Sequence, residues 1–369
     1  MTLTYLPASS APGSPLVAAP AAASGRGVRR PPRERSARRV LALGVAVVLM
    51  VLAAAASVAW GARVVGWGEV WTALATTLGA DESSSLSTAV VEQRIPRTAL
   101  ALLAGAALGL AGAVMQGVTR NPLADPGILG VTSGAALAVV VGIAFFGLSS
   151  ATGYVWVAIL GGGLCAAFVY AVGSLGRGGA TPLKLTLAGA ATGAAASSLT
   201  SAVLLPRLEV MNQFRFWQVG GVGGASFDKI GLVLPFLAVG ALLSLAAARG
   251  LNSLALGDDV AAGLGERVDR TRLLAALGAV VLCGAVTAVV GPIGFVGLVV
   301  PHVCRLVIGI DHRWLLPASM VVGAMLLTAA DVVGRVVARP SEVDVGIVTA
   351  ILGAPVFIAI VRRQKVRAL

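Results

Sequence analysis

The sequence predicts an all-α polytopic membrane protein with about ten transmembrane helices and both termini in the cytoplasm. Hydrophobic residues make up 57% of the 369 residues, and the mean hydropathy is +0.91. Charged residues make up 12%, about half of the roughly 25% that soluble domains carry. The basic residues gather beside long apolar runs, as membrane topology requires. This composition argues against a disordered chain, a disulfide scaffold and an ordinary cytosolic enzyme.

The chain divides into a tail and a transmembrane domain. Residues 1–39 are rich in Ala, Pro, Ser, Gly and Arg, which predicts a disordered, basic cytoplasmic tail. Residues 40–369 form the predicted transmembrane domain, and residues 40–60 are an apolar run of membrane-spanning length. A signal peptide is the alternative for this run, but its apolar core would be only about 7–15 residues long. We therefore expect a membrane anchor.

Nine further apolar segments follow the first. Glycine and proline interrupt several of them, so the predicted number of spans is accurate to within one helix. The segments are residues 98–118, 128–148, 152–176, 183–206, 229–249, 272–291, 293–310, 314–333 and 345–361.

The formal net charge of +12 raises the question of a nucleic-acid partner. The basic residues flank apolar segments and lack interleaved aromatic residues, so no nucleic acid is predicted to bind. With the N-terminus placed inside, most of the 28 Lys and Arg residues fall in cytoplasmic segments. An even number of spans with both ends inside therefore satisfies the positive-inside rule.

The sequence lacks the motifs that would indicate an enzyme. It has no phosphate-binding loop, no zinc-binding helix and no serine nucleophile elbow. The two histidines and three cysteines are not spaced as metal ligands. We expect no catalytic residue, no metal site and no cofactor. The spans also lack the chain of acidic residues that proton coupling needs, which disfavours an ion-coupled secondary transporter.

The informative motifs lie at the predicted membrane faces. Arg94-Ile-Pro-Arg97 precedes the second span, where Pro96 suits the first helical turn. On the inner side, Pro122 and Pro126 within Asn121-Pro-Leu-Ala-Asp-Pro-Gly127 prevent a continuous helix. Within residues 251–265, two acidic residues suit a helix start. Apolar residues in the same segment give this short cytoplasmic helix a face for docking.

These motifs resemble the permease subunit family of ABC importers for ferric siderophores, heme and vitamin B12. The matching residues run from Arg94 to Phe357. Besides the motifs above, they include Gly112-Ala-Val-Met-Gln116, residues 291–302, and Asp331 with Arg335.

The resemblance implies a type II ABC importer permease fold of ten helices that pairs with a second permease copy or a related permease. Two ATP-binding subunits would supply the energy, and an extracytoplasmic substrate-binding protein would deliver a metal chelate. The chain would then be a permease in a bacterial cytoplasmic membrane, surrounded by the lipid bilayer, and not an enzyme. We expect the cargo to be a ferric siderophore, with vitamin B12 or heme as the alternative. An ion-coupled secondary transporter is the alternative of another class.

The resemblance also assigns roles to individual residues. It implies that Arg94 and Arg335 dock the binding protein, with Arg97 as a weaker candidate. The residues that it assigns to coupling with the ATPase are Leu256, Asp258, Asp259, Val260 and Leu264. The gate or motif residues are Gln116, Asn121, Pro122 and Pro126, and residues 178–183 correspond to a cytoplasmic gate. Glu342-Val-Asp-Val-Gly346 departs from the family's Glu-Leu-Pro-x-Gly, which alters the charge of the outer rim.

Overall fold

The computed structural model describes residues 32–61, 66, 68, 86–176 and 181–367, and every regular element in them is helical. In chain order the elements are α1 (Pro32–Ala59), α3 (Leu86–Thr119), the 3-10 helix η1 (Pro126–Leu129), α4 (Val131–Phe146), α5 (Ala151–Ser174), α6 (Pro182–Leu204), α7 (Leu208–Gln218), α8 (Phe227–Ala246), α9 (Ala248–Leu254), α10 (Asp258–Gly263), α11 (Val268–Val290), α12 (Val296–Val307), α13 (His312–Val337) and α14 (Val345–Arg367).

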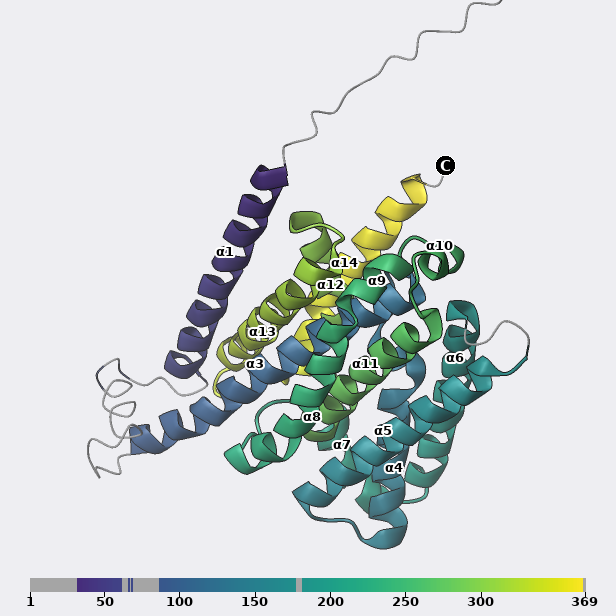
Figure 1. Ribbon diagram of the computed structural model, residues 1–369. Coiled ribbons are helices and arrows are strands. Elements are labelled where there is room, and N and C mark those ends of the chain that lie inside the picture. The colour runs from purple at the N-terminus through teal and green to yellow at the C-terminus, as the bar shows by residue number, and fades with distance from the viewer. Residues whose placement is uncertain (1–31, 62–65, 67, 69–85, 177–180, 368–369) are drawn as a thin grey trace, which may run out of the picture.

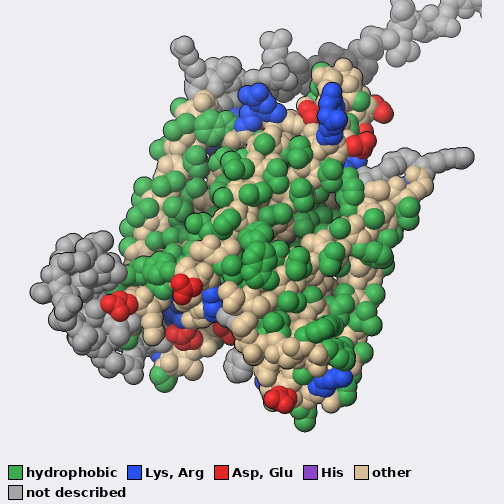
Figure 2. All heavy atoms as spheres, turned by 60° about the horizontal axis from the view of Figure 1, so that its bottom comes forward, with side chains coloured by type: hydrophobic (Ala, Val, Ile, Leu, Met, Phe, Trp, Pro, Cys, Tyr) green, Lys and Arg blue, Asp and Glu red, His purple; other side chains and the backbone are tan. Residues whose placement is uncertain are grey.

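The helices form one bundle with two distinct ends (Figure 1). The start of α1, the short helices α9 and α10 and the end of α14 lie at one end, which we call the α10 end. The start of α3 and helix α7 lie at the other, which we call the α7 end. Figure 2 shows hydrophobic side chains over most of the visible face, with charged side chains gathered in small groups.

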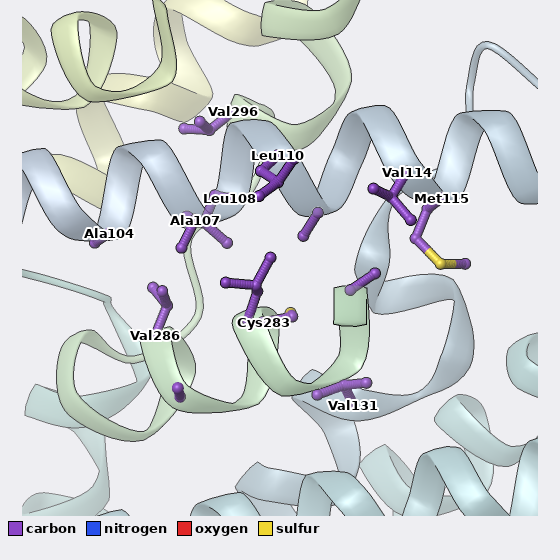
Figure 3. Close-up of a cluster of buried hydrophobic side chains, with 14 of the residues drawn as sticks. Ala104, Ala107, Leu108, Leu110, Val114, Met115, Val131, Cys283, Val286 and Val296 are labelled. Carbon is purple, nitrogen blue, oxygen red and sulfur yellow. The ribbon is translucent and has the colours of Figure 1, made fainter. Parts of the chain in front are cut away.

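Helices α3 and α11 lie at the centre of the bundle. Buried residues make up 78% of the apolar window of α3 and 67% of that of α11. Figure 3 shows Leu110 and Met115 of α3 in the same cluster as Cys283 of α11, with Val131 and Val296 at its margins. The core is built from aliphatic side chains and alanine, whose small size lets the helices approach closely.

Glycine permits a close helix contact between α3 and α13. A Cβ atom added at Gly105 would lie 2.3 Å from the carbonyl oxygen of Gly323, and one added at Gly109 would lie 2.2 Å from that of Ser319. No side chain fits at such distances, so the two backbones touch directly. This arrangement explains why two glycines four residues apart stand on one face of α3.

The ten predicted spans coincide with ten apolar helices. Seven of the described helices are long and apolar enough to cross a membrane, and three apolar helices are shorter, namely 131–146, 296–307 and 345–359. Helix α12 has 12 residues and is about 18 Å long, against about 30 Å of hydrocarbon. It begins only at Val296, three residues into the predicted segment. The reason is that Gly291 and Phe295 have positive φ angles, which a right-handed helix excludes. The number of complete crossings stays a prediction.

Two predicted boundaries are wrong. Helix α1 begins at Pro32, so residues 32–39 of the predicted tail are helical, and residues 1–31 lie outside the described part. Pro96 was expected in the first turn, but α3 begins at Leu86 and contains Pro96 in its interior. The proline leaves the carbonyl of Glu92 without its helical donor. Of the predicted gate, residues 178–180 lie outside the described residues.

Candidate functional site

Arginines bind the last carbonyl groups of α1 at the α7 end. Arg94 Nη1 donates hydrogen bonds to the carbonyl oxygens of Val58 (3.1 Å) and Ala59 (2.9 Å). Arg339 Nε donates to the carbonyl oxygen of Gly61 at 3.0 Å. The final carbonyls of a helix have no partner within the helix and carry partial negative charge. The Arg94 guanidinium therefore satisfies the last carbonyls of α1, and Arg339 holds the chain just beyond that helix.

Arg335 continues this arrangement from α13. Its Nη1 donates to the carbonyl oxygens of Ser57 (3.0 Å) and Trp60 (3.2 Å), and its Nη2 donates to Ser57 Oγ at 2.6 Å. Arg335 Nη2 also lies 2.9 Å from Asp331 Oδ2, one helical turn earlier. The arginine is 1% exposed, so the carboxylate of Asp331 offsets a buried positive charge.

Arg97 shares the same carboxylate. Its Nη2 lies 2.9 Å from Asp331 Oδ1, and its Nη1 lies 2.6 Å from Glu342 Oε2. Asp331 is fully buried between the two arginines, whereas the Glu342 side chain is 39% exposed. These contacts join α3, α13 and the loop before α14. We call Arg94, Arg97, Asp331, Arg335 and Glu342 the outer charge cluster.

The predicted docking arginines occupy different positions in this cluster. Arg94 and Arg335 are 5% and 1% exposed, and both are bonded to the end of α1, so neither presents its charge on the surface of this chain. The Arg97 side chain is 13% exposed. Sequence reasoning named the three arginines but missed Arg339 and the carbonyls of α1. The i, i+4 spacing of Asp331 and Arg335 was the one available signal.

At the opposite end, α10 forms where the acidic pair predicted a helix start. Gly257 precedes it with a φ of 112°, a conformation that favours glycine. Asp258 pairs with Arg120 at the end of α3. It also lies 3.2 Å from Nη2 of Arg272, near the start of α11. Asp258 therefore connects α10 to the two central helices, while Asp259 is exposed.

One side of α10 is apolar and uncovered in the described chain. Leu256, Val260 and Leu264 are 61%, 51% and 66% exposed. Ala261 is fully buried against the bundle. Exposed leucines at an end that also carries charged residues are unusual on a solvated surface, and they are suited to contact with another protein.

A second network at the α10 end joins α9, α13 and α1. Asn252 Nδ2 donates to Asp311 Oδ1 at 2.7 Å, and Arg39 Nε donates to the carbonyl oxygen of Ile308 at 3.0 Å. Burial of the Asp311 carboxylate opposes its ionisation. The hydrogen bonds from Asn252 and Arg313 and the charges of Arg39 and Arg313 outweigh this, so the pKa of Asp311 lies below its ordinary value. Sequence reasoning missed this network.

Gln116 joins α3 to α12. Its Nε2 donates to the carbonyl oxygen of Gly297 at 3.1 Å, and its Oε1 accepts from Arg305 Nη1 at 2.5 Å. Gln116 is 3% exposed. The amide thus supplies a donor to a carbonyl near the start of the short α12 and an acceptor to a half-buried arginine.

The remaining motif residues shape the connection between α3 and α4. Asn121 Oδ1 accepts from the backbone N–H of Leu123 at 2.9 Å, which fixes a tight turn around Pro122. Pro126 begins η1, and Asp125 Oδ1 accepts from the Gly127 N–H at 2.8 Å. As predicted, the helix does not continue through the two prolines: α3 ends at Thr119, before Pro122, and η1 begins at Pro126. Their contacts position helices, and a gating role stays a prediction.

Comparison with known proteins agrees with this architecture. Residues 48–363 match the FecCD transport family. The chain is 45% identical over 327 residues to the ferric enterobactin transport system permease protein FepD of Escherichia coli, covering 88% of this chain and 96% of that protein. It is 43% identical over 279 residues to the cobalamin import system permease protein BtuC of Halobacterium salinarum, covering 75% and 74%.

A solved structure described as an inward-facing metal-chelate type ABC transporter has a TM-score of 0.75 and 30% identity. The match covers 88% of this chain and 99% of that one. The family match, the relatives and the long apolar helices together establish a multi-pass membrane protein of the permease type. The chain belongs to the FecCD transport family.

Proposed function

We propose that the chain is the permease subunit of an ATP-driven importer that carries ferric siderophores across the cytoplasmic membrane of a bacterium. The observation that carries this proposal is the 45% identity to a ferric enterobactin permease over 88% of the chain. The alternative cargo is vitamin B12 or heme, and the cobalamin permease relative, matched over 75% of the chain, keeps it in consideration.

Energy would come from two separate ATP-binding subunits docked at the α10 end. The exposed Leu256, Val260 and Leu264 provide an apolar contact for them. Asp258 joins α10 to Arg120 of α3 and Arg272 of α11. Movement of α10 would therefore displace the two central helices, and this displacement would change which side of the membrane has access to the path. The chain itself would make and break no covalent bond.

A second permease, identical or related, would cover the exposed apolar residues of α6 and α14. These include Leu187 and Leu199 of α6 (62% and 56% exposed) and Ile351 and Ile358 of α14 (65% and 53% exposed). Small residues fill much of the remaining surface of α6, which favours close helix contact. Two copies facing each other through these helices would enclose a wide path for a large chelate.

The extracytoplasmic binding protein would dock at the α7 end. Arg97 and Glu342 of the outer charge cluster reach the surface, and Arg339 is exposed beside them. Arg94 and Arg335 would act on docking indirectly, by holding the end of α1 in place, unless docking displaces α1. Exposed charges at an interface set the association rate and the register of the partners.

The proposal is tested by uptake in a bacterial strain that lacks this chain. Uptake of radiolabelled iron as ferric siderophore is compared with uptake of labelled cobalamin and labelled heme, each with and without a plasmid that restores the chain. Loss of iron uptake alone, restored by the plasmid, is the expected result. Loss of cobalamin or heme uptake alone would change the assigned cargo to that compound, and the chain would still be an importer permease. Iron uptake that the plasmid does not change, in a strain with its other iron importers deleted, would contradict the proposal.

A further inference from the structure

A cavity of about 430 Å³ opens between α5, α8 and α11. Its lining is hydrocarbon except for the Tyr170 hydroxyl, and it includes Gly163 and Ala167 of α5 and Leu277 of α11. The volume falls in the range of sites that hold small molecules, about 300–1,000 Å³. An empty apolar cavity of this size is costly because its walls lose their packing partners, so an apolar occupant would stabilise the protein.

The cavity lies apart from the surfaces assigned to transport. None of its lining residues belongs to α6 or α14, the helices assigned to the second permease. Helix α14 packs on α12 and α13 instead. The rim of the cavity is apolar, since the lining residues Leu273 and Leu277 are each 47% exposed. In a chain embedded in a membrane, such a rim contacts lipid hydrocarbon.

The two ends of the cavity differ in chemistry. Towards the α7 end, Trp156 and the lining residue Phe236 pack edge to face, with ring centroids 5.5 Å apart. Towards the α10 end the wall includes Tyr170. One turn beyond the lining residue Leu273, Arg270 stands on the same stripe of α11, because residues 270, 273, 277 and 284 recur at helical spacing. The cavity is thus closed by aromatic rings at one end and has a cation beyond the other.

Arg270 is exposed and forms no hydrogen bond or ion pair within the described part of the chain. Arg267 and Asp269 are exposed on the same turn, so two arginines and one aspartate give this helix start a net charge of +1. An arginine at a helix end can lay its apolar stem along a hydrophobic wall and place its guanidinium at the headgroup level. Basic residues at the mouth of a pocket between transmembrane helices bind anionic headgroups.

We propose that this cavity holds one acyl chain of an anionic phospholipid, whose phosphate is bound by Arg270. The lipid comes from the leaflet at the α10 end. It fills the space between α5 and α11 and so stabilises the packing of the central helix α11. The occupant is a membrane lipid and not the cargo, because α6 and α14, the helices assigned to the path, contribute no residue to its lining.

A substitution that fills the cavity with a side chain tests directly whether a lipid binds there. Gly163 lines the cavity, and a Cβ atom added there would meet no atom within 4 Å, so Gly163→Leu adds a side chain at the cavity wall. Gly231→Leu on α8 is the matched control, since Gly231 is exposed and its Cβ would also meet nothing. The full-length chain, purified in detergent and stripped of lipid, is titrated with phosphatidylglycerol, and bound lipids are counted by native mass spectrometry.

The wild type and Gly231→Leu are expected to retain one more tightly bound phosphatidylglycerol per chain than Gly163→Leu. Equal retention by all three would overturn the proposal.

Arg270→Gln, which does not alter the cavity, is expected to weaken phosphatidylglycerol binding about fivefold, the equivalent of about 1 kcal/mol for one basic residue. It should leave binding of phosphatidylcholine with the same acyl chains unchanged. A wild type that binds both lipids equally would overturn the anionic assignment. Because lipid retention is counted without transport, the result is independent of the cargo.

Discussion

Asp331 is the residue on which the charged contacts of the α7 end converge. It lies within 2.9 Å of both Arg97 and Arg335 and is fully buried. A buried carboxylate is costly to desolvate, and here two guanidinium groups offset that cost. Because Arg335 also binds the carbonyls that end α1, the position of α1 depends indirectly on this single carboxylate.

Asp331→Asn is therefore expected to destabilise the protein by about 3–5 kcal/mol, since it leaves two buried arginines with an incomplete counter-charge. The measurement is the thermal unfolding midpoint of the full-length chain in detergent. Glu342→Gln is the matched control. Glu342 binds the same Arg97 from the surface, and exposed pairs contribute about 0–1 kcal/mol. Equal midpoints for the two variants would show that Asp331 is not the centre of the cluster.

At the scale of elements, α10 combines two separate properties. Its apolar side faces outward, and Asp258 binds Arg120 and Arg272 on the inner side. The first property provides a contact for a partner, and the second provides a connection to α3 and α11. Substitutions on the two sides should therefore have different consequences, which a merely connecting loop would not produce.

Leu256→Asp with Leu264→Asp is expected to abolish co-purification of the ATP-binding subunits, because it replaces an apolar contact with two charges that would be desolvated on docking. The control is Leu208→Asp, at a residue of α7 that is 70% exposed at the opposite end of the molecule. The amount of ATPase recovered with the affinity-tagged chain is measured by quantitative blot. Recovery equal to that of the control would remove α10 from the ATPase contact.

Asp258→Asn should have a different effect. The apolar contact remains, so the ATPase is expected to co-purify. The partly exposed ion pairs that connect α10 to the bundle are weakened by up to about 1 kcal/mol, and chelate transported per ATP hydrolysed is expected to fall up to about fivefold. The measurement is the ratio of uptake to ATP hydrolysis in proteoliposomes. An unchanged ratio would mean that Asp258 does not transmit the movement of α10.

At the scale of the whole molecule, α3 joins the two charged ends. Its 34 residues span about 51 Å. Arg97 lies in the outer charge cluster, Gln116 binds α12, and Arg120 just beyond the last turn binds Asp258. One central helix thus contacts the candidate docking region, the helix bundle and the candidate coupling element, as a transporter that responds at both faces requires.

The sequence predicted the helices well because apolar length is a local property. The ten apolar segments and the α10 start at Asp258 were identified from composition and spacing alone. The contacts of Arg94 and Arg335 with the end of α1 were not, because they join residues up to 278 positions apart and no periodic pattern reports them. The position of Pro96 inside α3 was also mispredicted, since tertiary packing outweighs the local preference of a proline.

The central claim is that ATP hydrolysed on a separate subunit drives import through this chain. The most direct measurement is accumulation of radiolabelled ferric siderophore in proteoliposomes that contain the full-length chain, with and without the ATP-binding subunits, in the presence of the loaded binding protein. We expect accumulation that requires both the ATP-binding subunits and ATP. Accumulation driven by an ion gradient in vesicles that contain the chain alone would contradict the account and identify a secondary transporter.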